Sequence, residues 1–189
     1  MTKTLILLFH PDLRRSKANA ALAAAAAKFP GVEVVDMQAA YPDSMDMYRD
    51  GEREARRLLA ADRIVLQFPI QWYSTPPLLK AWQDAVLTRM FYVAYELEGR
   101  ALEGKPLLIA ATAGNVAEAY VAGGRNMFTI DALLAPLRAT AHRCGLGWSE
   151  PFVVYEADKL EPPMLQAAAA GYAATLEAWI SASVDSKAA

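Results

Sequence analysis

Three largely apolar runs place the strongest limits on how this chain of 189 residues can fold. They cover residues 3–9 (KTLILLF), 63–68 (RIVLQF) and 105–112 (KPLLIAAT). A strand with one face in water alternates apolar and polar residues, whereas a strand covered on both faces is apolar throughout. Helix-forming stretches separate the runs along the chain. The pattern therefore predicts an α/β fold, with parallel strands joined by right-handed crossovers.

The remaining segments complete this pattern. Shorter strands are predicted at residues 32–36 and 152–155, which makes five strands and suits the flavodoxin-like sheet order 2-1-3-4-5 with helices on both faces. Helices are predicted at residues 16–29, 52–61, 76–87, 130–143 and 162–180. Loops or connections are predicted at residues 41–50, 91–104 and 116–128, and a frayed tail at residues 181–189. Because no linker or internal repeat is found, residues 1–189 are expected to form a single domain.

Composition excludes several classes of protein. A formal net charge of −2 without a basic cluster argues against a nucleic-acid surface. The single cysteine, Cys144, has no partner for a disulfide or a metal site, so we expect a reducing compartment and a buried apolar role. No apolar segment has the length of a membrane span. The expected location is the cytoplasm, either in solution or peripheral at the inner face of the membrane.

The loop after the first strand favours an anionic ligand. It contains no glycine between Phe9 and the following helix, and the chain has neither a dinucleotide-binding glycine motif nor a phosphate loop. Ser16 is a plausible helix cap, and the first-turn N–H groups of Lys17, Ala18 and Asn19 have no intrahelical acceptor. With positive residues nearby, this helix start suits a monophosphate. Taken alone, however, Ser16 is an ordinary cap.

Two further loops follow strands in the same way. One is the aromatic segment FPIQWYSTPP at residues 68–77, and the other is TAGN at residues 112–115. In isolation, tryptophan and tyrosine at such positions are more often core or interface residues, and His10 after the first strand is more often a structural hydrogen-bonding group. In a parallel sheet, however, these three loops would meet at one edge. Together they would surround a flat aromatic ligand that carries a phosphate.

The motifs in these loops resemble a known family. His10-Pro11 with Ser16 and Asn19, then FPIQWY followed by PxLLKxWxD, then TAGN with Tyr120 are similar to the NAD(P)H:quinone oxidoreductase family. The resemblance is strongest to its small bacterial branch, which includes the ancillary protein of the glutathione-regulated potassium-efflux system. It covers nearly the whole chain and is most specific in the aromatic loop. It implies a flavodoxin-like fold, a tightly bound flavin and a homodimer with active sites at the subunit interface.

The resemblance also implies roles for individual residues. The flavin phosphate and ribityl chain would be held by His10, Ser16, Lys17, Ala18 and Asn19. The isoalloxazine ring would be lined by Ile70, Gln71, Trp72 and Tyr73. Its pyrimidine side would meet Thr112, Ala113, Gly114 and Asn115. Tyr120 would lie over the substrate pocket and is, with Asn126, an expected catalytic residue.

The chain departs from the family pattern in three ways, and these change which features of the family can be expected here. Asn126 stands where the animal enzymes have a histidine, and an amide exchanges no proton near neutral pH, so a tyrosine–histidine proton relay is not carried over. Asn115 replaces a second glycine. The chain also lacks the long C-terminal extension of the animal enzymes, which favours FMN over FAD.

The expected activity is two-electron, ping-pong transfer of hydride from NAD(P)H through FMN to a quinone. An azo or nitro compound is an alternative acceptor, and nothing in the sequence selects NADH or NADPH. A second hypothesis is a redox-sensing ancillary subunit that docks on a potassium-efflux transporter. A one-electron flavodoxin carrier is the least favoured, because such carriers are strongly acidic and this chain is nearly neutral.

Overall fold

The computed structural model describes residues 2–185, which are built around one parallel sheet. Its strands are β1 (Thr4–Leu8), β2 (Val32–Asp36), β3 (Arg63–Pro69), β4 (Pro106–Thr112), β5 (Gly147–Trp148) and β6 (Phe152–Val154). The order is β2-β1-β3-β4-β5, with β6 also paired to β4, and every pairing is parallel. The predicted fold and strand order are confirmed. The short strand β5, which pairs with the start of β4, was not predicted.

Successive residues of the central strands pack on opposite faces of the sheet. In β1, Leu5 and Leu7 join one apolar cluster, while Ile6 between them joins the other. In β3, Leu66 and Val65 divide in the same way. Both clusters are buried, which is why these strands read as largely apolar runs.

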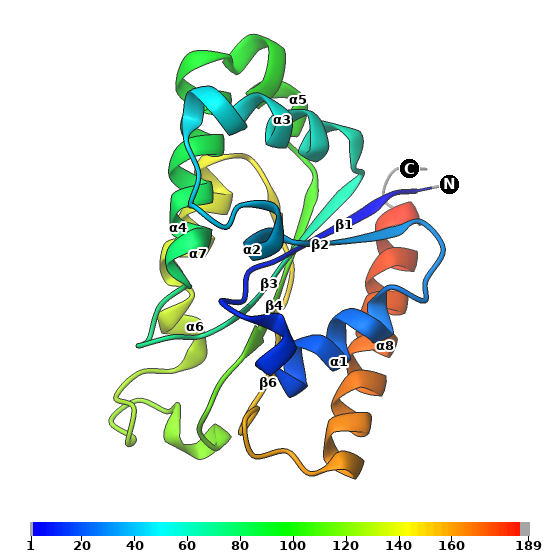
Figure 1. Ribbon diagram of the computed structural model, residues 1–189, viewed down its shortest axis with the longest axis vertical. Coiled ribbons are helices and arrows are strands. Elements are labelled where there is room, and N and C mark those ends of the chain that lie inside the picture. The colour runs from blue at the N-terminus through cyan, green and yellow to red at the C-terminus, as the bar shows by residue number, and fades with distance from the viewer. Residues whose placement is uncertain (1, 186–189) are drawn as a thin grey trace.

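Helices cover the two faces unequally (Figure 1). The smaller layer consists of α1 (Lys17–Ala26) and α8 (Pro162–Asp185), whose Leu22 and Leu176 are fully buried together with Ile6. The larger layer contains α3 (Met47–Ala60), α4 (Pro77–Trp82) and α7 (Ala135–Arg143). The remaining short helices are η1 (Leu13–Arg15), α2 (Met37–Ala40), η5 (Ala117–Ala119) and α6 (Ile130–Leu133). Among residues 2–185 no helix combines the length and apolar character of a bilayer span.

Part of the segment predicted as a loop at residues 41–50 is helical. Helix α3 begins at Met47, five residues before the predicted start. Asp46 caps it, because its carboxylate accepts hydrogen bonds from the backbone N–H groups of Tyr48 and Arg49 at 3.0 and 2.9 Å. The methionines and Pro42 masked this cap in the sequence.

The prediction of a connection at residues 91–104 was wrong. After α4 the chain continues through three π-helical segments, Gln83–Leu87, Arg89–Val93 and Tyr95–Gly99, into α5 (Arg100–Leu102). Gly99 looked like a helix breaker, but it allows close packing, because a Cβ there would lie 2.6 Å from the carbonyl oxygen of Met90. Arg89 and Glu98 further join the last two π-helical segments through an ion pair at 2.8 Å.

Two helix boundaries also differ from the prediction. The helix predicted at residues 130–143 breaks at Leu134, because Pro136 in the first turn of α7 has no N–H with which to continue α6. The tail predicted to fray from Ser181 remains helical to Asp185, where α8 ends. Residues 186–189 lie outside the described part of the chain.

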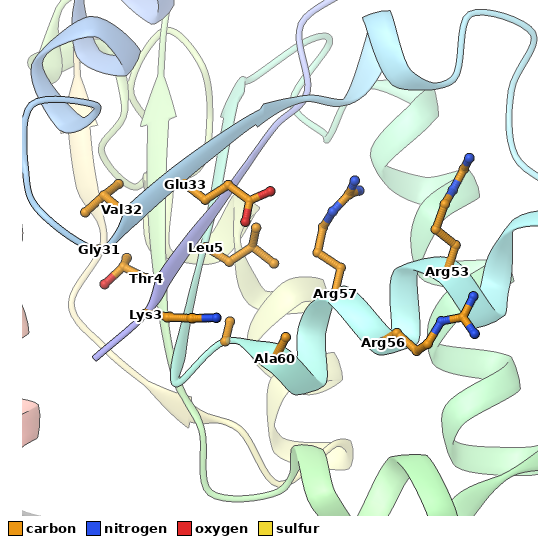
Figure 2. Close-up of a pocket in the computed structure, with 11 residues that line it drawn as sticks. Lys3, Thr4, Leu5, Gly31, Val32, Glu33, Arg53, Arg56, Arg57 and Ala60 are labelled. Atoms are coloured by element: carbon orange, nitrogen blue, oxygen red, sulfur yellow. The ribbon is translucent and has the colours of Figure 1, made fainter. Parts of the chain in front are cut away.

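A groove of about 540 Å³ opens where β1 and β2 begin, beside α3. Figure 2 shows that the guanidinium groups of Arg53, Arg56 and Arg57 come from α3 and that Glu33 comes from β2. All three arginines already have partners. Arg57 pairs with the fully buried Glu54, Arg56 pairs with Glu52, and Arg53 donates to the hydroxyl of Tyr41. The polar groups of this groove are therefore largely satisfied by the protein itself.

Candidate functional site

Two adjoining cavities lie at the carboxyl ends of the strands, which is the end of the sheet opposite the arginine-lined groove. Strand register places Leu8 beside Gln67, Pro69 beside Thr112, and Thr112 beside Val154, so the loops after β1, β3, β4 and β6 leave the same edge. This is where ligands bind in open α/β sheets. The first cavity, about 290 Å³, is lined by His10, Arg15, Ser16, Lys17, Ala18, Asn19, Pro69, Ile70, Thr112, Ala113, Gly114, Ala157 and Asp158.

Helix α1 opens toward the first cavity with unpaired backbone donors. Ser16 is its N-cap, and the Ser16 hydroxyl accepts a hydrogen bond from the N–H of Asn19 at 3.2 Å. The first backbone bond of the helix runs from the N–H of Ala20 to the carbonyl of Ser16. The N–H groups of Lys17 and Ala18 precede that bond, so they remain available to an anion.

His10 lies at the same helix start in a defined tautomer. Its Nδ1 accepts a hydrogen bond from the backbone N–H of Asp12 at 3.1 Å. Burial lowers the pKa of His10 below its usual 6.5, which outweighs the opposing effects of Asp12 and Asp36. The ring is therefore neutral at pH 7, and its Nε2–H is free to donate a hydrogen bond.

A buried network beneath the cavity ties two strands, β3 and β4, to the start of α1. The side-chain amide of Asn19 donates to Thr112 Oγ1 at 3.0 Å and to Ser16 Oγ at 3.3 Å. Gln67, fully buried in β3, donates from Nε2 to the carbonyl of Asn19 at 2.9 Å. This network fixes the helix start against the sheet. Sequence analysis missed Gln67, because it stands within an apolar run and resembles any other strand residue.

The aromatic loop after β3 is a tight turn in a strained conformation. Gln71 and Ser74 exchange backbone hydrogen bonds of 2.9 and 3.0 Å, while Trp72 and Tyr73 between them have φ values of +45° and +64°. Two consecutive positive φ angles define a type I′ turn, which favours glycine and asparagine. The Trp72 side chain is 93% exposed. Strain of this kind, without compensating burial, is typical of functional loops.

The second cavity, about 320 Å³, shares Ile70 and Gly114 with the first. Its complete lining is Ile70, Trp72, Tyr73, Gly114, Asn115, Tyr120, Arg125, Asn126 and Lys159. Gly114 has no side chain to separate the two spaces, so a flat ligand can extend from one into the other. Of the residues expected from the sequence, Gln71 alone lines neither cavity.

Tyr120 occupies the second cavity as a neutral donor. Its ring packs against Tyr155, with centroids 5.8 Å apart. Burial raises the pKa of Tyr120 above 10, so the phenol stays protonated at neutral pH. The N–H of Asn126 donates to the carbonyl of Ala119 at 3.0 Å, which fixes the loop that carries both side chains.

Sequence analysis also missed the contribution of residues 157–159 to this site. Ala157 and Asp158 line the first cavity and Lys159 lines the second. They follow β6 at the same sheet edge, so the rule applied to the other three loops also locates them. No group of histidine, cysteine and carboxylate side chains within residues 2–185 is suited to hold a metal ion.

Comparison with known proteins identifies the family. A family model described as a flavodoxin-like fold matches residues 2–177. The glutathione-regulated potassium-efflux system ancillary protein KefF of Salmonella newport is 41% identical over 182 residues, covering 93% of this chain and 96% of that protein.

Two solved structures are also similar. An NADPH-quinone reductase from P. pentosaceus is 34% identical, with a TM-score of 0.76 over 91% of this chain and 96% of that one. General stress protein 14 from Treponema denticola, in complex with FMN, is 32% identical, with a TM-score of 0.81 over 93% and 98%. The resemblance expected from the loop motifs is confirmed, and the chain belongs to the flavodoxin-like family, among relatives named as quinone reductases and potassium-efflux ancillary proteins.

Proposed function

We propose that this protein is an FMN-dependent oxidoreductase that takes two electrons from NAD(P)H and delivers them to a quinone in a ping-pong cycle. The single observation that carries this proposal is the continuity of the two cavities across Ile70 and Gly114. One cavity has the donors of a phosphate site and the other has the aromatic and polar groups of a substrate site. Relatives named as an NADPH-quinone reductase and as an FMN complex agree with this assignment.

The donor set of the first cavity fits the phosphate and ribityl chain of FMN. The N–H groups of Lys17 and Ala18, the Ser16 hydroxyl and His10 Nε2 provide neutral donors, while Arg15 adds positive charge. No glycine-rich turn is present for a diphosphate, which supports FMN over FAD.

The second cavity fits a flat ring and its substrate. Ile70, Gly114 and Asn115 would lie along the isoalloxazine, and Thr112 with Ala113 would meet its pyrimidine side from the first cavity. Bound FMN would accept a hydride from the nicotinamide and pass two electrons on to the quinone. The protein itself would position both substrates and exclude water.

Tyr120 and Asn126 would act on the acceptor. Since the Tyr120 phenol remains protonated, it can donate a hydrogen bond to a quinone oxygen as negative charge develops there. Asn126 can donate a second hydrogen bond from its amide. Trp72 and Tyr73 would form the apolar wall against which both substrates lie.

Replacing Tyr120 with phenylalanine tests this role. Losing one hydrogen bond to developing charge should lower kcat with a quinone about tenfold to a hundredfold, because such bonds contribute roughly 1.5–3 kcal/mol. The dissociation constant of FMN and the rate of flavin reduction by NADPH should stay unchanged. Wild-type turnover by the variant would remove Tyr120 from the mechanism.

We also infer a homodimer that covers the second cavity. Trp72, Met127 and Phe128 are large apolar side chains at or next to its lining, and all three are more than half exposed in the single chain. Such a cluster suits contact with a second copy. Light scattering that gives twice the mass of 20.6 kDa would support the dimer, and a monomer at micromolar concentration would contradict it.

A transporter partner is a second candidate function, favoured by the 41% identity to an ancillary protein of a potassium-efflux system. In this protein the reductase and the ancillary role would use the same bound flavin, so the two proposals are compatible. Co-purification with a potassium-efflux transporter would support this role. Absence of binding under both reducing and oxidising conditions would contradict it.

A further inference from the structure

Two positive side chains in the second cavity have no acidic partner. Arg125 and Lys159 both line it, no carboxylate is among its lining residues, and neither side chain makes an ion pair or hydrogen bond with another described residue. An arginine or lysine in a concave polar site raises the local concentration of anions. The cavity as described thus has more positive charge than the protein neutralises.

The loop that carries Arg125 is held in place by its own backbone. Asn126 donates to Ala119 at 3.0 Å, Met127 donates to Gly124 at 2.8 Å, and Gly123 donates to Met127 at 3.1 Å. Gly124 packs closely in this turn, because a Cβ there would lie 2.8 Å from the Val121 side chain and 3.1 Å from the Ala119 carbonyl, so both would have to shift. Arg125 is therefore presented on a defined turn beside Tyr120.

The turn that carries Lys159 is anchored to the same strand end. Glu156 donates to the carbonyl of Asn115 at 3.1 Å, and Ala157 donates to that of Ala113 at 3.0 Å. Lys159 closes the turn by donating its N–H to Glu156 at 2.8 Å. Lys159 thus lies on the loop after β6, which is hydrogen-bonded to the loop after β4 that carries Arg125. Both cations are placed beside the wall where the substrates are proposed to lie.

The groove at the other end of the sheet provides a contrast. It also contains arginines, but Arg56 and Arg57 are paired with Glu52 and Glu54, and Glu33 adds a carboxylate (Figure 2). An anion arriving there would compete with partners already in place. In the second cavity neither Arg125 nor Lys159 has such a partner within the described chain, while Asp158, whose carboxylate lies near Gly114, lines the adjoining first cavity.

We propose that Arg125 and Lys159 bind the phosphate groups of the reduced nicotinamide dinucleotide and so determine the affinity for the electron donor. This assignment rests on the proposed function, since it takes the second cavity as the substrate site. A nicotinamide lying on the aromatic wall carries its anionic pyrophosphate, and in NADPH also a 2′-phosphate, away from the ring. The guanidinium group of Arg125 and the ammonium group of Lys159 are of the kinds that bind such phosphates in proteins.

The test compares Arg125→Gln, Lys159→Gln and the double variant with the wild type, all loaded with FMN. Anaerobic stopped-flow reduction gives the dissociation constant and limiting rate with NADPH, NADH and 1-benzyl-1,4-dihydronicotinamide, a donor without phosphate. Calorimetric titration with NADP⁺ measures binding without any electron transfer. Arg56→Gln, which removes a positive charge at the far groove, is the matched control.

Each single variant should raise the dissociation constants of NADP⁺ and NADPH about fivefold to tenfold, and the double variant should raise them more than either. The limiting rate of flavin reduction should be unchanged. Reduction by the phosphate-free donor should be unchanged in every variant, as should all constants of Arg56→Gln. A loss of affinity shared by NADH and NADPH assigns the pair of cations to the pyrophosphate, whereas a loss of affinity confined to NADPH assigns it to the 2′-phosphate. Either outcome supports the proposal.

Wild-type affinity for NADP⁺ and for both dinucleotides in the double variant would overturn the proposal. An equal loss of affinity for the phosphate-free donor would also overturn it, since that result would show general damage to the site. A loss of affinity for a sulfonated quinone acceptor, with unchanged affinity for every donor, would assign the pair to the acceptor and contradict the donor role. If no donor reduces the wild type, the proposed function fails, while NADP⁺ calorimetry still decides whether the two cations bind phosphate.

Discussion

At the scale of single residues, the site combines strain with neutral donors. Trp72 and Tyr73 occupy a left-handed region that residues with side chains seldom adopt, and Trp72 gains almost no burial in exchange. Burial lowers the pKa of His10 and raises that of Tyr120, so both groups are neutral at pH 7 and each can donate a hydrogen bond. These properties suit ligand contact better than they suit the stability of the free chain.

Trp72→Asn should stabilise the protein without FMN. Asparagine tolerates the positive φ of a type I′ turn, and an exposed tryptophan loses little packing when it is replaced. We expect a gain of about 0.5–1 kcal/mol, or about 2 °C in Tm for a chain of this size. Thermal unfolding measures it. Tyr48→Asn, an equally exposed change within α3, should give no gain, and a lower Tm for Trp72→Asn would contradict the strain.

The lowered pKa of His10 sets the sign of a pH effect. The unfolded chain binds a proton near pH 6.5, whereas the folded chain binds it only at lower pH. Unfolded molecules therefore hold more protons in that interval, so this group reduces the free energy of unfolding as the pH falls below 6.5. Urea unfolding of FMN-free wild type and His10→Gln at pH 7.5 and 5.5 isolates the contribution. An NMR titration midpoint for His10 at or above 6.5 would contradict it.

At the scale of elements, the sequence reveals strands and helix starts better than unusual helices. The runs that became β1, β3 and β4 were found because burial on both faces leaves few polar positions. The helical segments after Leu87 were missed, because Gly99 carries the same sequence signal whether it ends a helix or allows two segments to touch. Only the position of the Met90 carbonyl separates these meanings, and that position depends on tertiary packing.

Gly99→Ala should therefore be strongly destabilising. A methyl group 2.6 Å from a backbone oxygen forces the two π-helical segments apart, at a cost of about 2–3 kcal/mol. Gly171→Ala is the matched control within α8, where the added Cβ would meet the Phe152 ring at an ordinary 3.9 Å. It should instead gain about 0.5–1 kcal/mol from helix propensity. Equal effects of the two changes on urea unfolding would show that the contact at Gly99 is unimportant.

At the scale of the whole molecule, one topological rule accounts for the site. Parallel strands bring every loop that follows them to one edge, which is why three loops far apart in the sequence could be expected to meet. The same rule reaches residues 157–159, but Gln67 and Arg125 depend on packing and loop geometry that no local pattern encodes. The far end of the sheet holds a separate arginine-rich groove, whose Arg56 and Arg57 are paired with carboxylates of the protein itself.

If the two adjoining cavities hold FMN, the bound flavin should accept electrons from NAD(P)H. The most direct test is the visible absorption spectrum of the purified protein after FMN is added and the excess removed, followed by anaerobic addition of NADPH. We expect yellow absorbance that stays with the protein and bleaches directly to the two-electron reduced form. Failure to retain FMN would contradict the account, since the phosphate site, the shared wall and the substrate site all depend on it.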